Sequence, residues 1–373
     1  LSNIRMRFSL MIVNFMYGIG SYREELIKGF KFTQKLVQLN KELSELNVQD
    51  VQEPFREALQ KIEIPKEFRL PVDSRLIVES FIIDKCKVMN SKKKPFFLVF
   101  KNAAPFATAP VMTMFKAGDD LRQDQLILQL MKIMEHLWRK EGLDFGMRCY
   151  SVLPTGLNQG FIEVVPNAIT ESELQVDKGT FNKQIYVKYL KKKNPTDQKY
   201  EEARRNFLLS SVGYAVATCV LGVTDRHPGN IMIQDDGHFF HVDFGHFLGN
   251  FKKFNGIQTE DAPFHFISSY VEILDGKKSI YFKTFLTSSA DALNILRKNA
   301  KLLITLLVLM IGTGIPELQK LEDIQYFKDM LFLDSTEKEA GEKFKELTIR
   351  SLKSWKTYLK AKFHNEKEAK TSK

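Results

Sequence analysis

Apolar positions recur at helical spacing through the first part of the chain. Between residues 4 and 62 they return every three or four positions, first at Phe8, Ile12, Phe15 and Met16. This is the period of an amphipathic helix, so residues 4–62 are expected to be helical. The later stripe consists of Leu26, Phe30, Phe32, Leu36, Leu39, Leu43 and Leu46.

The pattern changes to short apolar runs separated by turn-forming residues, which predicts β-strands. The first runs are 75–83, 85–89, 96–101 and 111–115. Residues 124–140 return to the helical period, and two more strands are predicted at 147–153 and 160–165, split by a Pro-Thr-Gly turn. After Asn167 the chain is predicted to be mainly helical. The fold class is therefore α+β, with a small antiparallel β lobe before a larger helical lobe.

Composition narrows the class of partner. The chain has 373 residues, of which 44% are hydrophobic, and carries a formal net charge of +10. These values are typical of a globular protein whose partner is a polyanion: nucleic acid, an anionic membrane or a phosphorylated small molecule. The apolar run 302–311 is about half as long as a bilayer span and predicts a buried core helix. Because the first residue is Leu, we expect the chain to be part of a longer protein.

The three cysteines give no sign of a disulfide framework or of a metal-binding pair. Cys86, Cys149 and Cys219 lie far apart in the sequence. Such spacing favours a reducing compartment.

The most informative segment runs from Val223 to Gly245. Its two strand-like runs, 231–233 and 239–242, flank Asp236-Gly237, a favoured pair for a two-residue hairpin turn. With that turn, Asn230 and Asp243 face each other with Cβ atoms roughly 5 Å apart. An amide oxygen and a carboxylate at this separation can share one Mg²⁺ or Mn²⁺. Any one of these polar residues is equally consistent with an ordinary loop, but their joint spacing favours a metal site.

Asp225 adds a second spacing. It precedes Asn230 by five residues, as in the catalytic loop of protein kinases, and Asp243-Phe244-Gly245 matches the metal-binding Asp-Phe-Gly of those enzymes. The order Asp225-Arg226-His227 reverses the protein-kinase His-Arg-Asp. The segment therefore predicts a kinase of another kind.

These motifs resemble the phosphatidylinositol 3-kinase family, in particular its class I catalytic subunits. Asp-Arg-His-x-x-Asn followed by Asp-Phe-Gly-His carries the resemblance, and the segments 85–95, 115–124, 213–222 and 243–249 extend it. The resemblance implies a two-lobed, protein-kinase-like fold. It divides the chain into the end of a helical accessory domain (1–20), an N-lobe (21–163) and a C-lobe (164–373). Within the C-lobe it places a catalytic loop (222–232), an activation loop (243–264) and a basic helix (342–365).

The resemblance also assigns the ATP contacts. Ser91 and Lys92 belong to a basic loop that resembles the family's phosphate-binding loop, although a solvated turn would look similar. Lys116 resembles the catalytic lysine that contacts the ATP phosphates. Asp124 and Tyr150 resemble an inner-pocket pair, and the acidic residues near Asp124 could equally be helix caps.

Adenine is expected to bind at the hinge. The resemblance assigns the hinge to Glu163, Val164 and Val165, with Met232 and Val242 as the apolar floor below the base, and Asp243 near the phosphates. Asp225, His227 and His246 are candidates for the group that takes the proton of the attacking hydroxyl, and the sequence does not choose among them. His241 is expected only to pack in the hairpin.

The activation loop is expected to contact the inositol headgroup through Lys252 and Lys253. Residues 258–261, which are basic in family members that accept the bisphosphate, read Gln-Thr-Glu-Asp. Two acidic residues there should repel extra phosphates, so unphosphorylated or monophosphorylated lipid is favoured. Pro228-Gly229 departs from the polar pair of class I members, which leaves protein substrates open.

The C-terminal segment is strongly basic. Residues 341–373 carry ten Lys/Arg and four Asp/Glu, and Trp355, Lys356 and Lys360 lie on one predicted amphipathic helix. Such a helix suits an anionic membrane, and a helix docked on the large lobe with a solvated basic face is the alternative.

The favoured hypothesis is an ATP- and Mg²⁺-dependent lipid kinase that phosphorylates the inositol 3-hydroxyl. It is expected to be cytoplasmic and peripheral at the inner face of membranes, with a regulatory subunit bound through domains outside this chain. A serine/threonine protein kinase of the same superfamily is the first alternative. A basic nucleic-acid-binding protein is the second, although no helix-turn-helix, zinc or RNA-recognition signature is present, so no nucleic acid is expected.

Overall fold

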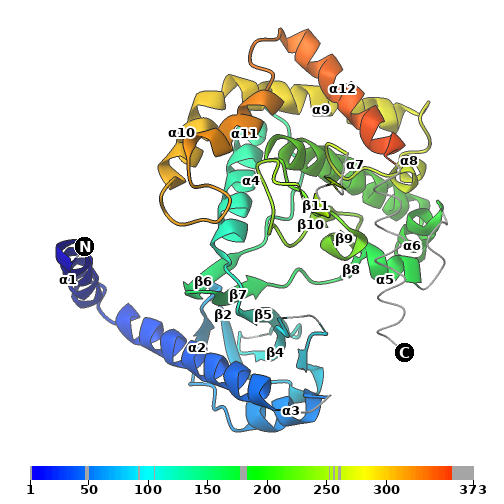
Figure 1. Cartoon of the computed structure of the whole chain (residues 1–373). Coiled ribbons are helices and arrows are strands. Elements are labelled where there is room, and N and C mark those ends of the chain that lie inside the picture. Colours follow the sequence, from blue (N-terminus) through cyan, green and yellow to red (C-terminus); the bar gives the residue numbers. More distant parts are fainter. Residues whose placement is uncertain are drawn as a thin grey trace. The chain divides into compact units, whose positions relative to one another are not determined.

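A computed structural model describes residues 2–46, 50–90, 93–104, 106–176, 183–251, 253–254, 257–258 and 262–354. The chain divides into two compact units. Unit 1 contains residues 1–125 and 150–164, and unit 2 contains residues 126–149 and 165–373. Unit 1 is built around an antiparallel sheet and unit 2 is mainly helical, so the predicted α+β class is confirmed (Figure 1).

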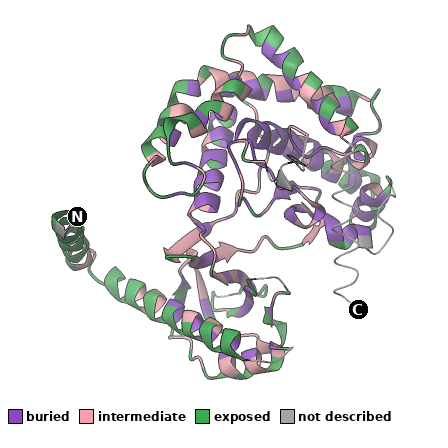
Figure 2. Cartoon of the chain, viewed as in Figure 1, coloured by how far each residue is buried: buried purple, intermediate pink, exposed green. Residues whose placement is uncertain are grey.

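Unit 1 begins with three helices. They are α1 (Ser2–Gly18), α2 (Tyr22–Glu45) and α3 (Gln52–Gln60). The apolar stripe of α2 is buried at Phe32, Leu36, Leu39 and Leu43, whereas the apolar side chains of α1 are largely exposed (Figure 2). The helical period therefore predicts α2 and α3 correctly, but a continuous helical stretch to residue 62 is interrupted around Asp50.

A seven-stranded antiparallel sheet follows, in the order β1-β2-β4-β5-β7-β6, with β3 paired to β4. Its strands are β1 (Phe68–Leu70), β2 (Asp73–Phe81), β3 (Lys87–Val88), β4 (Phe96–Asn102), β5 (Val111–Ala117), β6 (Val152–Gly156) and β7 (Gln159–Glu163), with a 3₁₀ turn η1 (Ile83–Lys85) before β3. Aromatic rings fill the space between α2 and the sheet, since Phe32 lies 4.9 Å from Phe68 and 6.2 Å from Phe161 between ring centroids. This core holds β5 and β7, which carry Lys116 and Glu163.

Two details of the predicted sheet are wrong. The strand expected at 147–153 begins only at Val152, because the preceding backbone is bound by side chains instead of a neighbouring strand. Glu135 accepts from the amide of Met147, and Tyr214 donates to the carbonyl of Arg148. The turn between β6 and β7 lies at Leu157-Asn158, two residues beyond the centre of the expected Pro-Thr-Gly turn, and Asn158 adopts φ 55°.

Unit 2 is organised around α7 (Asp197–Val220), most of whose last sixteen residues are buried. The other helices are α5 (Glu171–Val176), α6 (Ile185–Lys193), α8 (Ser268–Ile273), α9 (Ile280–Lys298), α10 (Ala300–Met310), α11 (Gln325–Met330) and α12 (Glu337–Lys353), with 3₁₀ turns η2 (Pro228–Asn230) and η3 (Leu321–Ile324). Helix α4 (Arg122–Lys140) begins in unit 1 and continues into unit 2.

A three-stranded sheet, β10-β9-β8, packs on α7. It consists of β8 (Ala168–Thr170), β9 (Ile231–Gln234) and β10 (Phe239–His241). A short hairpin, β11 (Lys253–Phe254) and β12 (Ile257–Gln258), lies between the Asp-Phe-Gly segment and α8.

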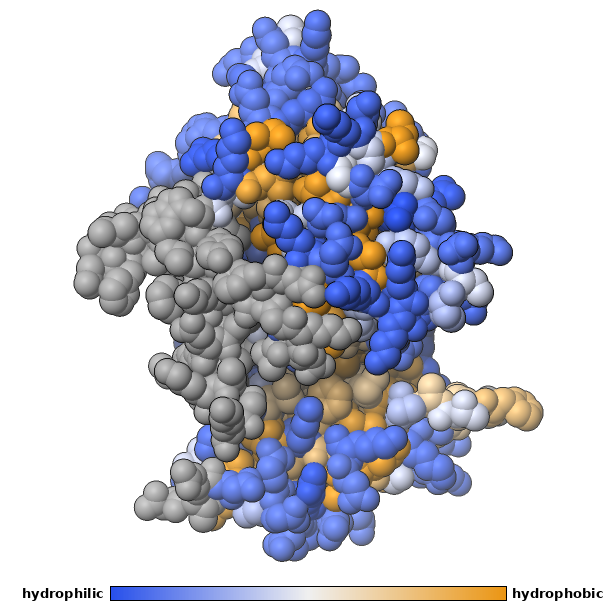
Figure 3. All heavy atoms as spheres, turned by 90° about the vertical axis from the view of Figure 1, so that its right-hand side faces the viewer, coloured by the Kyte–Doolittle hydropathy of each residue, from blue (hydrophilic) through white to orange (hydrophobic). Residues whose placement is uncertain are grey.

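The apolar run at 302–311 forms most of α10. Leu303 and Leu307 are buried, but Leu302 and Leu309 are exposed, so only one face of the helix belongs to the core. Among the described helices, none combines the length and apolar character that a bilayer crossing requires. Figure 3 shows a face on which hydrophilic side chains predominate, with smaller apolar areas between them.

Candidate active site

The hairpin that carries the central motif has a three-residue turn. Gln234 and His238 face each other, because the amide of Gln234 donates to the carbonyl of His238 at 2.8 Å, and Asp235, Asp236 and Gly237 form the loop. The expected two-residue Asp236-Gly237 turn is therefore wrong by one residue. Gly237 adopts φ 90°, and a Cβ there would lie 2.0 Å from a backbone oxygen of α7. Only glycine satisfies both constraints, which seats the turn against α7.

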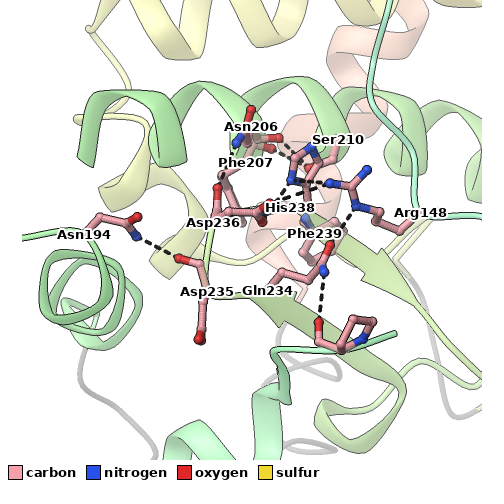
Figure 4. Close-up of polar contacts among 11 residues, drawn as sticks. Arg148, Asn194, Asn206, Phe207, Ser210, Gln234, Asp235, Asp236, His238 and Phe239 are labelled. Atoms are coloured by element: carbon pink, nitrogen blue, oxygen red, sulfur yellow. Dashed lines mark hydrogen bonds and ion pairs between the residues drawn. The ribbon is translucent and has the colours of Figure 1, made fainter. Parts of the chain in front are cut away.

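Polar side chains fix this turn from several directions (Figure 4). Arg148 donates to the Gln234 side chain at 2.7 Å and contacts the His238 ring at 3.1 Å. Asn194 and Asn206 donate to the carbonyls of Asp235 and Asp236 at 2.7 and 2.9 Å. The turn is thereby held to α6 and α7, which fixes the ends of β9 and β10 that adjoin it.

The turn sets the register of the strands. Ile231 pairs with His241, and the amide of Val242 donates to the carbonyl of Asn230 at 3.0 Å. The prediction that Asn230 faces Asp243 is therefore wrong, because the extra turn residue moves every pair by one position. Asp243 comes one residue later, is exposed, and adopts φ 60°, so the chain leaves the strand there.

Arg226 joins the predicted catalytic loop to the Asp-Phe-Gly segment, a role that the sequence analysis did not assign. Its guanidinium donates to the carbonyls of Thr224 (3.0 Å), Val242 (2.7 Å) and Asp243. The side chain is only 6% exposed, and its charge lies 5.7 Å from the centre of the Phe244 ring. Arginine suits this position because its planar fork offers several donors in fixed directions.

The way in which α7 ends places Asp225 close to the segment that follows Asp-Phe-Gly. Gly222, at φ 59°, ends the helix, and the amide of Val223 then donates to the carbonyl of Thr218, a Schellman arrangement. The amide of the next residue, Thr224, donates to the carbonyl of His246 at 3.1 Å. Asp225 therefore lies beside the backbone of His246, and its own carbonyl accepts the side-chain amide of Asn230 at 3.3 Å.

The two candidate histidines have different partners. The Nδ1 atom of His227 accepts from the amide of Gly229 at 3.2 Å. The Nδ1 atom of His246 lies 2.7 Å from a carboxylate oxygen of Glu317, which the sequence analysis did not single out. The other oxygen of Glu317 accepts from the amide of Phe247 at 2.6 Å.

His241 packs as expected. It is 1% exposed and stacks on Tyr214, with ring centroids 5.3 Å apart and planes at 5°. Burial, together with the positive charge of Arg226, holds the pKa of His241 well below its usual value. It is a neutral core residue of the hairpin.

Unit 1 groups basic side chains at the end of β5. Lys116, opposite Gly160 of β7, lies 3.4 Å from a carboxylate oxygen of Asp119. Lys93 donates to the carbonyl of Gly118 at 2.5 Å. Among the described residues of the basic loop, Lys93 therefore contacts the segment that follows β5, and the sequence analysis did not single it out.

The predicted inner-pocket residues Asp124 and Tyr150 are both buried in unit 1, at 7% and 5% exposure. The side chain of the neighbouring Asp120 accepts from the amide of Arg122, the first residue of α4, and pairs with the Arg122 guanidinium, whose hydrogen bond lowers the pKa of that carboxyl.

The predicted hinge residues lie at and after the end of the last strand of unit 1. Glu163 ends β7, where its amide and carboxylate bind the backbone of Ser151, and Val164 and Val165 are half-buried. In unit 2 Met232 pairs with Phe240, so Met232 and Val242 lie on the same, half-buried face of the hairpin. The opposite face, turned to α7, is fully buried.

Several predicted residues lie outside the described part of the chain: Ser91, Lys92, Lys252, Trp355, Lys356 and Lys360. Lys253 is described through its backbone only, in β11. Helix α12 ends at Lys353, and Ser354 is extended with ψ 111°.

The arrangement in unit 2 defines a class of protein. A hairpin preceded by Asp-x-x-x-x-Asn and followed by Asp-Phe-Gly matches the order of the catalytic-loop and metal-binding motifs of kinases. Residues 110–320, more than half of the chain, match the family model "Phosphatidylinositol 3- and 4-kinase". The chain belongs to the phosphatidylinositol 3- and 4-kinase family, as the resemblance of its motifs implied.

Individual relatives agree with this family. The chain is 40% identical to phosphatidylinositol 3-kinase 1 of Dictyostelium discoideum, over 98% of this chain and 23% of that protein. It is 44% identical to phosphatidylinositol 3-kinase 3 of the same organism, over 80% of this chain and 18% of that protein. It is also 40% identical to the human phosphatidylinositol 4-phosphate 3-kinase C2 domain-containing subunit beta, again over 80% and 18%. The chain spans about a fifth of the length of these curated relatives.

Proposed function

We propose that this chain transfers the γ-phosphoryl group of ATP to the 3-hydroxyl of the inositol ring of a phosphatidylinositol lipid. The observation that supports the proposal is that Arg226 donates to the carbonyls of Val242 and Asp243 while Asn230 donates to the carbonyl of Asp225, so the loop 225–230 and Asp243 are held at the end of one hairpin. Family membership makes ATP the phosphate donor. The relatives named phosphatidylinositol 3-kinases support the lipid and the 3-position.

Asn230 and Asp243 are proposed to bind a divalent metal ion, on the chemistry of their side chains and not on a cross-strand pairing. The side-chain nitrogen of Asn230 donates to the carbonyl of Asp225, so the amide oxygen is the end that remains to bind a cation. Asp243 adds an exposed carboxylate. Both are hard oxygen donors, as Mg²⁺ or Mn²⁺ requires. When bound, such an ion neutralises charge on the phosphates.

The remaining residues bind and orient the nucleotide. Lys116, on a strand end stiffened by β4 and β7, supplies a fixed positive charge for the phosphates, and Ser91, Lys92 and Lys93 are proposed to add donors from the adjoining loop. Adenine is proposed to bind the backbone of Glu163, Val164 and Val165, and Met232 and Val242 are proposed to supply apolar contacts to the base. Asp124 and Tyr150 are proposed as the inner-pocket residues that the family resemblance implies.

Lipid recognition is assigned to the basic segments. Lys252 and Lys253 are proposed to contact the inositol headgroup, and Trp355, Lys356 and Lys360 the anionic membrane. The acidic residues within 258–261 favour unphosphorylated or monophosphorylated lipid over the bisphosphate. The protein would then act as a peripheral protein at the cytoplasmic face of a membrane.

The domain assignment is proposed on the same basis. Residues 1–20 would close a helical accessory domain, 21–163 and 164–373 would form the two kinase lobes, and further domains of the longer protein would bind any regulatory subunit.

The test is transfer of labelled phosphate from ATP to liposomes that contain phosphatidylinositol and its mono- and bisphosphates, with the products separated by thin-layer chromatography. Asp243→Ala should abolish transfer. Asp275→Ala is the matched control, because Asp275 is also exposed with a left-handed backbone (φ 62°) in unit 2. Wild-type transfer by the Asp243 variant, or labelling of protein alone, would refute the proposal.

A further inference from the structure

Glu317 contacts the candidate active site although it lies about seventy residues further along the sequence. It lies between α10 and η3, and both of its carboxylate oxygens bind the segment that follows Asp-Phe-Gly: one the Nδ1 atom of His246, the other the amide of Phe247. The carboxylate is 15% exposed and the imidazole 34%. A half-buried carboxylate that bridges a side chain and the next backbone amide fixes both the position and the rotation of the ring.

The carboxylate also decides which ring nitrogen carries the proton. A carboxylate can only accept, so a neutral His246 must hold its proton on Nδ1 and leave a lone pair on Nε2. His227 is the reverse case. Its Nδ1 accepts the amide of Gly229, so a neutral His227 carries its proton on Nε2. The Nε2 atom of a neutral His246 is therefore a hydrogen-bond acceptor, whereas the Nε2 atom of a neutral His227 is a donor.

We propose that Glu317 is a positioning residue that makes His246, and not His227, the proton acceptor of the phosphoryl transfer. This inference rests on the proposed function. The proton of the attacking lipid hydroxyl moves to Nε2 of His246 while the hydroxyl oxygen bonds to the γ-phosphorus. The bond from that phosphorus to the bridging oxygen breaks, ADP leaves, and the imidazolium later releases its proton to water. Through the transfer, Glu317 faces the positive charge that develops on the ring, which an amide in its place could not balance.

The first measurement separates turnover from binding. Glu317→Gln keeps the shape of the side chain but removes the charge, and it can accept only one of the two hydrogen bonds at a time. It should lower kcat for lipid phosphorylation by about 10- to 100-fold, within the usual range for acid–base assistance, with the KM for ATP nearly unchanged. Glu322→Gln is the matched control, since Glu322 is exposed on η3, five residues further along the chain. Glu317→Asp, which keeps the charge, should recover part of the lost kcat.

A double variant tests whether Glu317 acts through His246. If it does, adding Glu317→Gln to His246→Gln should lower kcat little further, because the partner is already absent. If the double variant instead lowers kcat by the product of the two single effects, the proposal is overturned. Circular dichroism of each variant identifies one that fails to fold, and the aspartate variant then carries the kinetic test.

A spectroscopic readout is independent of activity. In ¹⁵N-histidine-labelled full chain at pH 8, the His246 signals, assigned by their loss in His246→Gln, should report the proton on Nδ1, whereas His227 should report it on Nε2. Glu317→Gln should move the His246 proton toward Nε2. A wild-type His246 with its proton on Nε2 refutes the proposal even if lipid turnover is found. If the wild type phosphorylates no lipid, the proposed function fails, and the ring-nitrogen signals still decide whether Glu317 sets the tautomer.

Discussion

Replacing Arg226 by Met tests how the catalytic loop is held to Asp243. The arginine donates to three backbone carbonyls, those of Thr224, Val242 and Asp243. Methionine fills a similar volume but donates no hydrogen bond, so these carbonyls lose a charged partner in a site where the side chain is 6% exposed.

The size of the effect follows from the contacts. A hydrogen bond to a charged group contributes about 1.5 kcal/mol at the lower end of its range, so three such bonds give roughly 4–5 kcal/mol. That is a large part of the total stability of a typical domain. Arg226→Lys keeps the charge but cannot reach three carbonyls at once, and it should cost roughly half as much. Release of the Asp243 backbone should also misplace its carboxylate, and a displacement on the order of 1 Å lowers turnover by about 100-fold.

Urea unfolding and ADP release measure the two effects separately. Trp138, buried in unit 2 beside Phe145 at 5.1 Å, gives a fluorescence signal for unfolding. Arg205→Met is the control, because Arg205 is exposed on the same unit. The reasoning fails if Arg226→Met keeps both the stability and the kcat of the wild type.

Three further predictions concern the framework of unit 2. Gly237→Ala should lower the free energy of unfolding by about 3 kcal/mol or more, measured by thermal denaturation, because the added Cβ meets a backbone oxygen at 2.0 Å; an unchanged melting temperature would contradict the turn geometry. Burial raises the pKa of the Cys219 thiol, which is 1% exposed, to about 12, so this thiol stays protonated at pH 8 and should react with iodoacetamide only after unfolding; rapid alkylation of Cys219 in the native chain would show that it is not buried. Glu171→Gln should cost about 2–3 kcal/mol in urea unfolding, because Glu171 and His265 form a buried pair at 3.1 Å; a loss below about 0.5 kcal/mol would show that the charge of Glu171 is not needed.

Periodicity predicted the elements that pack along one face. The stripe of α2 and the strands β4 and β5 lie close to where the spacing of apolar residues put them, because burial of a single face sets that spacing. The strand prediction failed at 147–151 because the apolar residues of this segment are buried without strand pairing. Its backbone bonds go to Glu135 and Tyr214, and such long-range partners leave no periodic signal.

The motif predicted that Asp225, Asn230 and Asp243 lie on adjoining segments next to one hairpin, but not the register in which its strands pair. Asp-Gly is compatible with turns of two or three residues, and the choice depends on contacts of the turn with α7 that lie outside the hairpin. The roles of Arg226 and Glu317 were missed for a related reason. Arg226 donates to backbone carbonyls, whose positions no side-chain pattern reveals, and Glu317 lies about seventy residues from its partners. A buried arginine inside the motif was the one available signal for the first, and the sequence offered none for the second.

The most direct test of the central claim is the position of the phosphate on the lipid product. The full chain is incubated with ATP, Mg²⁺ and phosphatidylinositol liposomes, and the deacylated product is compared by chromatography with inositol 3-phosphate and 4-phosphate standards. A product that co-migrates with the 3-phosphate, and that disappears with Asp243→Ala, is the predicted result. A product phosphorylated at the 4-position, or phosphate transferred to protein with none on lipid, would contradict it.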